Sequence, residues 1–147
     1  MLADQGKPSL LLVEDDEDDA FFFHRTFRKS GAQFRIEHAL NGAQAIERLQ
    51  SALAANSLPR LIFLDLKMPV LNGFDVLTWM RKQSFPAPIP VVVLTGSEEQ
   101  EDKTRALALG AIEYLVKPVG MGDFERLLAG VFFKEPIPAI HQTGTSP

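Results

Sequence analysis

The chain has 147 residues, of which 46% are hydrophobic and 23% are charged, so it is long enough for one domain with a substantial core. Its net charge of −4 and its lack of a basic cluster argue against binding nucleic acid through the phosphate backbone. The absence of cysteine excludes disulfides, thiolate catalysis and cysteine-ligated metals. The sequence shows no signal peptide and no apolar run of membrane length, so we expect a cytoplasmic protein without membrane association.

Short apolar runs alternate along the chain with segments of helical periodicity. The runs predict strands at residues 9–13, 34–40, 61–66, 90–95 and 113–118. Capping residues between them predict helices that begin near Glu17, Asn41, Asn72, Ser97 and Asp123. Ser30-Gly31 reads as the end of the first helix, and Ser97 to Gln100 reads as a capping box for the fourth.

The strand pattern predicts the fold class. Runs such as LLLV, LIFL and VVVL are apolar at consecutive positions, so both faces of these strands should be buried between helices. With right-handed crossovers, this predicts an α/β fold with a doubly wound (βα)5 parallel sheet. The domain is expected at 9–133, between an N-terminal tail at 1–8 and an extended or disordered C-terminal tail at 134–147.

Polar side chains follow the strands at their carboxyl ends, where ligands bind in such sheets. They are Glu14 and Asp15 after the first strand, Asp65 in the third, Thr95 in the fourth and Lys117 in the fifth. Three carboxylates in one small site need a cation or raised pKa values, and Mg²⁺ prefers oxygen ligands. With the metal bound, one carboxylate could attack a phosphoryl group, while the lysine and the hydroxyl hold the phosphoryl oxygens.

Four motifs occur in order and at characteristic spacings: LLVED, LIFLDLKMP followed by NGFDVL, VVVLTGS, and YLVKP. On these motifs the chain resembles the receiver domain of two-component response regulators over residues 9–133. The resemblance implies the flavodoxin-like receiver fold with strand order 2-1-3-4-5.

The resemblance also implies residue roles. Asp65 corresponds to the phosphoacceptor, and Glu14, Asp15 and the backbone carbonyl of Lys67 correspond to the Mg²⁺ site, with Glu14 acting through a metal-bound water. Thr95 corresponds to the switch hydroxyl and Lys117 to the phosphate-binding lysine. Tyr114 matches the aromatic switch position, and Pro118 suggests a cis peptide that directs Lys117 into the site.

The function implied is that of a stand-alone response regulator, a phosphoacceptor signalling protein rather than an enzyme. A sensor histidine kinase, or a histidine phosphotransfer protein, would supply the phosphoryl group, and a conformational switch would pass the signal to a partner. A narrower resemblance, to the small receivers that serve phytochrome kinases, implies a phytochrome kinase as partner and is consistent with a homodimer.

Other readings remain. A pseudo-receiver, an interaction module on the same fold, is never phosphorylated and usually lacks some of these residues. A haloacid-dehalogenase-like phosphatase would need an aspartate at position 67, and a flavodoxin-like cofactor binder would need a phosphate-cradling loop after the first strand. Glu14 and Asp15 could also be only an acidic helix start. Asp16 to Asp19 lie at the start of the first predicted helix, where the helix dipole favours negative charge although their crowding opposes it. His24, His38 and His141 show no metal-ligand spacing.

Overall fold

The computed structural model describes residues 6–96 and 98–132, without the side chains of residues 131 and 132. Ser97, the C-terminal tail at 134–147 with His141, and most of the N-terminal tail lie outside the described residues. None of the helices in the described part of the chain is both long and apolar enough to span a membrane.

The chain forms a five-stranded parallel sheet with strand order β2-β1-β3-β4-β5, which confirms the predicted fold class. The strands are β1 (Ser9–Val13), β2 (Arg35–Ala39), β3 (Leu61–Asp65), β4 (Val91–Thr95) and β5 (Glu113–Val116). They alternate with the helices α2 (Glu17–Ser30), α3 (Gly42–Ala54), α4 (Gly73–Arg81), α5 (Gln100–Ala108) and α6 (Met121–Phe132).

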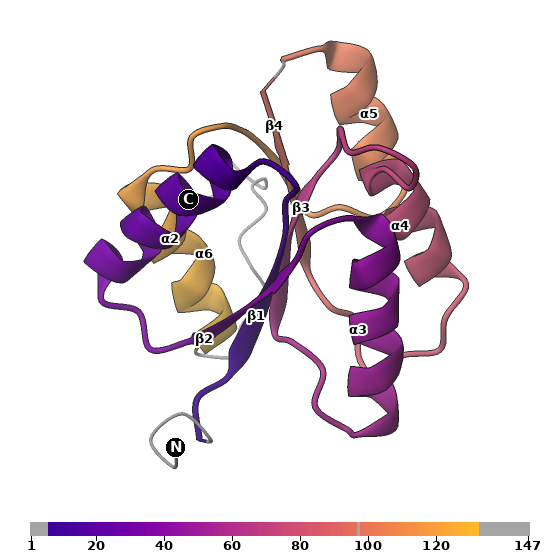
Figure 1. The fold of residues 1–147 in the computed structure, drawn as a ribbon, viewed down its shortest axis with the longest axis horizontal. Helices are drawn as coiled ribbons and strands as arrows, with labels where there is room; N and C mark the ends of the chain where they lie inside the picture. Colours follow the sequence, from indigo (N-terminus) through magenta and orange to yellow (C-terminus); the bar gives the residue numbers. More distant parts are fainter. Residues whose placement is uncertain (1–5, 97, 133–147) are drawn as a thin grey trace, which may run out of the picture.

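The helices cover both faces of the sheet. Helices α2 and α6 lie on one face, and α3, α4 and α5 lie on the other (Figure 1). Every residue of β1, β3 and β4 is buried, as their consecutive apolar residues predict, whereas the edge strands β2 and β5 are mostly half-buried. The sheet is therefore the middle layer of three, and its central strands carry most of the buried apolar area.

The two faces have different cores. Under α2 and α6 the core is aromatic, with Phe23, Phe27, Phe63 and Phe124 all buried. The ring of Phe124 meets Phe23, Phe27 and Phe63 edge to face, with centroids 5.0, 5.6 and 5.6 Å away. Under α3, α4 and α5 the core is mainly aliphatic. Because Phe23 and Phe27 are one helical turn apart, they share the inward face of α2, and Phe21 and Phe22 are left exposed.

Local capping sets several helix ends. Helix α2 begins after Asp16, whose side chain accepts a hydrogen bond from the Asp19 backbone, and ends at Gly31 in the left-handed region (φ 74°). Glycine adopts this conformation without a steric penalty. The predicted end of the helix at Ser30-Gly31 is confirmed. Asn72 and Asp75 form a reciprocal capping box at the start of α4.

One predicted helix start was wrong, and a second differs from the prediction by two residues. Helix α5 begins at Gln100 rather than Ser97, because the backbone at Glu99 is still extended (φ −62°, ψ 125°) and no side chain caps the helix there. Helix α6 begins at Met121, two residues before Asp123. Asp123 lies in the first turn, where its carboxylate accepts a hydrogen bond from the Gly120 backbone N–H at 3.2 Å.

Candidate functional site

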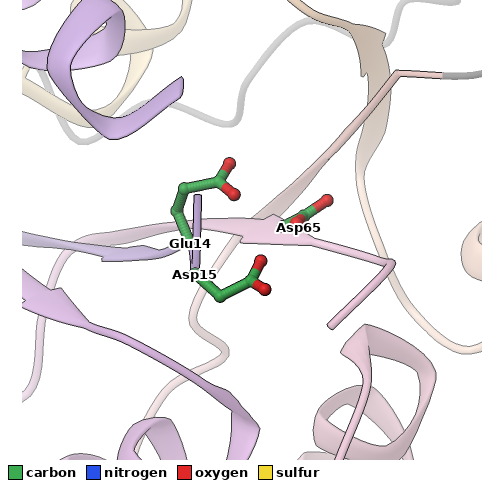
Figure 2. A group of neighbouring side chains, drawn as sticks. All are labelled: Glu14, Asp15 and Asp65. Carbon is green, nitrogen blue, oxygen red and sulfur yellow. The ribbon is translucent and has the colours of Figure 1, made fainter. Parts of the chain in front are cut away.

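The acidic residues meet where β1 and β3 leave the sheet. Val13 pairs with Leu64 in the parallel register, so the residues that follow, Glu14 and Asp65, come side by side. Glu14 is 2% exposed and Asp65 is 4% exposed, whereas Asp15 faces solvent. Figure 2 shows the three carboxylates directed into the same space from the ends of these strands.

This arrangement suits a hard divalent cation. One carboxylate oxygen from each of Glu14, Asp15 and Asp65 lies within 4.8 Å of the others. Burial, followed by the charge of Glu14, raises the pKa of Asp65 from 3.8 to about 7. Crowded, poorly hydrated carboxylates are therefore the distinctive feature of the site, and Mg²⁺ would offset their charge through ligands of the kind it prefers. Glu14, Asp15 and Asp65 are the side chains that would hold it.

Lys117 brings the only ammonium group that contacts these buried carboxylates in the described part of the chain. Its Nζ lies 2.9 Å from Glu14 Oε1, 2.7 Å from Asp19 Oδ2 and 3.5 Å from Asp65 Oδ1. Its backbone N–H donates to the Thr95 carbonyl at 2.7 Å, and its peptide bond to Pro118 is cis. Burial disfavours the charge on Lys117, but hydrogen bonds to Asp19 and Glu14 outweigh it and raise the pKa of the amine.

The remaining predicted site residues lie at different depths. Thr95 ends β4 and is completely buried, and Tyr114 on β5 is half-buried against the aliphatic core. Lys67 is exposed; its backbone N–H donates to Asp65 Oδ1 at 3.4 Å, and its Nζ lies 3.6 Å from Asp102 Oδ2 on α5. Lys67 thus connects the loop after Asp65 to α5.

A single cleft of about 330 Å³ collects most of these residues. It is lined by Glu14, Asp15, Asp16, Asp19, Asp65, Lys67, Thr95, Gly96 and Lys117. Pro118 lines a second, neighbouring cavity of about 290 Å³, and Tyr114 lines neither. The topology therefore brings together the residues predicted from four separate strand ends.

Sequence reasoning missed three contacts at this site. Asp16 caps α2, Asp19 pairs with Lys117, and His38 Nε2 lies 2.9 Å from the backbone carbonyl of Glu14. Helical spacing could have indicated Asp19, because it precedes the buried Phe23 by one turn and so lies on the face of α2 that points toward the sheet. No comparable signal marks His38.

The sequence matches the response regulator receiver domain family over residues 10–129, and the chain belongs to this family. Receiver domains are phosphoacceptor signalling modules that partner with histidine kinases, and the site described above is of the type that binds Mg²⁺ in them.

Individual proteins show how far the likeness extends. The chain is 36% identical over 118 residues to the probable methanogenesis regulatory protein FilR2 of Methanothrix harundinacea, covering 80% of this chain and 76% of FilR2. It is 37% identical to the transcriptional regulatory protein PrrA of Mycobacterium leprae, covering 80% of this chain but only 47% of PrrA. The solved structure of the bacteriophytochrome response regulator RtBRR is similar with a TM-score of 0.73 and 34% identity, covering 85% of this chain and 78% of that one.

Proposed function

We propose that this receiver domain takes a phosphoryl group onto Asp65 in the presence of Mg²⁺ and signals through the change that follows. One observation carries the proposal: the buried Asp65 carboxylate has carboxylate oxygens of Glu14 and Asp15 within 4.8 Å and the Lys117 ammonium at 3.5 Å. A nucleophile, oxygen ligands for a cation and a phosphate-binding cation thus share one cleft.

The proposed reaction transfers a phosphoryl group between two proteins. An oxygen of the ionised Asp65 carboxylate forms a bond to phosphorus, while the bond from phosphorus to a histidine nitrogen of the donor breaks. The electron pair of that bond stays on the departing nitrogen, and the product is an acyl phosphate. Mg²⁺, held by Glu14, Asp15, Asp65 and the predicted Lys67 carbonyl, would offset charge that develops on the phosphoryl oxygens. Lys117 would bind one of these oxygens.

The same geometry supports a switch. Thr95 is buried beside the site at the end of β4, and Tyr114 is packed on β5, the neighbouring strand. A phosphoryl group on Asp65 would attract the Thr95 hydroxyl, and Tyr114 could then turn inward and reshape the surface of β5, α5 and α6. Phosphorylation shifts such an equilibrium only through its different interaction with the two states.

The first test is intact mass spectrometry after incubation with acetyl phosphate, with and without Mg²⁺. We expect wild type to gain one labile phosphoryl adduct only with Mg²⁺, and Asp65→Asn to gain none. Asp18→Asn is the matched control, because Asp18 is an exposed aspartate nearby that does not line the cleft. An adduct on Asp65→Asn would show that the phosphoryl group goes to a residue other than Asp65. No adduct on folded wild type, from either acetyl phosphate or a panel of histidine kinases, would favour the pseudo-receiver alternative.

We further propose that the phosphodonor is a sensor histidine kinase of the phytochrome class. The likeness to RtBRR, at 34% identity over most of both chains, supports this partner. The test compares phosphotransfer from a purified phytochrome-type kinase with transfer from kinases of other sensor classes. Equal or slower transfer from the phytochrome-type kinase would remove the support for this pairing. Homodimer formation stays a prediction, to be checked by analytical ultracentrifugation.

A further inference from the structure

Asp19, in the first turn of α2, makes the shortest contact to the Lys117 ammonium. Nζ lies 2.7 Å from Asp19 Oδ2, compared with 2.9 Å to Glu14 and 3.5 Å to Asp65. Asp19 belongs neither to the group of carboxylates that could hold the metal nor to the acceptor. The ammonium expected to bind the phosphoryl group is therefore shared with a carboxylate outside the proposed chemistry.

A ring of contacts holds Asp19 in this position. Asp16 Oδ1 accepts a hydrogen bond from the Asp19 backbone N–H at 2.9 Å, and Glu14 Oε2 accepts one from the Asp16 backbone N–H at 3.1 Å. Lys117 closes the ring, because its Nζ contacts both Asp19 and Glu14. Although the Asp19 side chain is 40% exposed, its backbone is fixed by the helix cap and its carboxylate is directed at Lys117.

The pair also lies at the boundary between two cavities. Glu14, Asp19 and Lys117 line both the acidic cleft that contains Asp65 and the neighbouring cavity, which is otherwise lined by apolar residues such as Phe22 and Phe23. Asp65 lines the acidic cleft but not the neighbouring cavity. Asp19 therefore gives the ammonium an alternative partner at the side of the cleft formed by α2.

We propose that Asp19 is a positioning residue for phosphoryl transfer. Its carboxylate holds the Lys117 ammonium partly away from Asp65 until the ammonium binds the incoming phosphoryl group. This inference rests on the proposed phosphoacceptor role of Asp65. By sharing the ammonium, Asp19 leaves more negative charge on Glu14 and Asp65 to attract a divalent cation. In exchange, the incoming phosphoryl group must compete with Asp19 for Lys117.

These two effects predict that Asp19→Asn binds Mg²⁺ more weakly but is phosphorylated faster. The Mg²⁺ dissociation constant, measured by calorimetry without a phosphodonor, should rise about two- to fivefold, as expected for a partly exposed ion pair. At saturating Mg²⁺, the rate of phosphorylation by acetyl phosphate should instead rise by a similar factor, because Lys117 no longer has to leave Asp19. General damage to the fold would weaken metal binding and slow transfer together.

The controls isolate the role of Lys117. Asp18→Asn removes the same charge from the neighbouring exposed position, and Asp19→Glu keeps a carboxylate there and should restore Mg²⁺ affinity toward the wild-type value. In a Lys117→Met background, which removes the ammonium, Asp19→Asn should have no effect beyond that of Asp18→Asn on Mg²⁺ affinity. Mg²⁺ binding is measured in every variant, so a variant with impaired transfer still reports on the contact.

Failure of the proposed role of Asp19 can be distinguished from failure of the proposed phosphoacceptor role of Asp65. If wild type is phosphorylated but Asp19→Asn behaves like Asp18→Asn in both measurements, the role of Asp19 is overturned and the phosphoacceptor role stands. If the Asp19→Asn effect on Mg²⁺ affinity persists unchanged without Lys117, the role of Asp19 is also overturned. If folded wild type takes no phosphoryl group from any donor, the phosphoacceptor role itself is overturned.

Discussion

Phe63 and Asp65 lie two residues apart on β3, point to the same face of the sheet and are both almost completely buried, but their burial has opposite effects. Phe63 is surrounded by other aromatic rings, so removing it from water stabilises the fold. Asp65 lies where the strand leaves the core, and burial there disfavours its charge and raises its pKa to about 7. The buried core stabilises the strands, and this stability offsets the unfavourable crowding of the carboxylates at the ends of β1 and β3.

The largest effect is expected on the aromatic side of this comparison. Phe124→Ala removes a completely buried ring that contacts Phe23, Phe27 and Phe63, and should lower the free energy of unfolding by about 3–5 kcal/mol. Urea unfolding monitored by circular dichroism measures the change. A loss below about 1 kcal/mol would show that the cluster relaxes around the cavity and is not a principal source of stability.

Asp65→Asn is expected to change the free energy of unfolding in the opposite direction, by stabilising the fold. The folded-state pKa of Asp65, about 7, exceeds its ordinary value of 3.8. Between these two pH values the folded protein therefore holds a proton on Asp65 that the unfolded chain has lost. The stability that this proton contributes is fully present below about pH 4 and is lost as the pH rises through about 7. Without Mg²⁺, the variant should therefore be more stable than wild type by on the order of 2–4 kcal/mol at pH 8, and by less at pH 5.

Urea unfolding in a chelator at pH 5 and pH 8 provides the measurement for Asp65→Asn. Excess Mg²⁺ is the control, and it should reduce the advantage of the variant at pH 8 by stabilising folded wild type. An advantage that does not change with pH would mean that ionisation of Asp65 does not oppose folding.

Gly73→Ala disturbs the boundary between core and site. A Cβ at this position, the start of α4, would lie 2.5 Å from the Asp65 carbonyl oxygen and 2.9 Å from the Leu66 Cα. Since both are backbone atoms, the end of β3 must shift, and the free energy of unfolding should fall by about 1–3 kcal/mol. Phosphorylation by acetyl phosphate should slow as well, because Asp65 moves with its backbone.

Gly122→Ala is the control for Gly73→Ala, since its added Cβ in α6 would meet no atom within 4 Å other than the adjacent residues and the helix's own backbone. It should leave stability unchanged or raise it by a few tenths of a kcal/mol, as alanine favours helix. If Gly73→Ala behaves in the same way, the close approach of α4 to β3 does not hold Asp65 in position.

The smallest effect is expected at the surface of α2. Phe21 is 57% exposed, so Phe21→Ser should change the free energy of unfolding by no more than about 0.5 kcal/mol. Phe23→Ser, two residues away in the aromatic core, should be strongly destabilising, and urea unfolding of both variants makes the comparison. A large effect at Phe21 would mean that α2 has a contact that the described residues do not contain.

Much of this organisation was predictable from the sequence. Consecutive apolar residues in LLLV, LIFL and VVVL require burial on both faces, and the structure buries every residue of β1, β3 and β4. Parallel strands bring their carboxyl ends to one edge, so Glu14, Asp15, Asp65, Thr95 and Lys117 were expected in one cleft. Less was predictable where signals were weak: Ser97 and Gln100 resemble a capping box, but the backbone stays extended through Glu99.

The sequence by itself determined the succession of strands and helices along the chain, the residues buried between the layers and the acidic character of the site, because these follow from local periodicity and composition. Only the tertiary structure decided how the charges are paired. Six acidic residues follow Val13 without a break, and helical spacing relative to Phe23 indicates only that Asp19 lies on the inward face of α2, not which residue it pairs with. The direction of α2 over the sheet places Asp19 2.7 Å from Lys117, nearly one hundred residues away in sequence, and leaves Asp18 in solvent. Ion pairs depend on distances between atoms, and packing sets those distances.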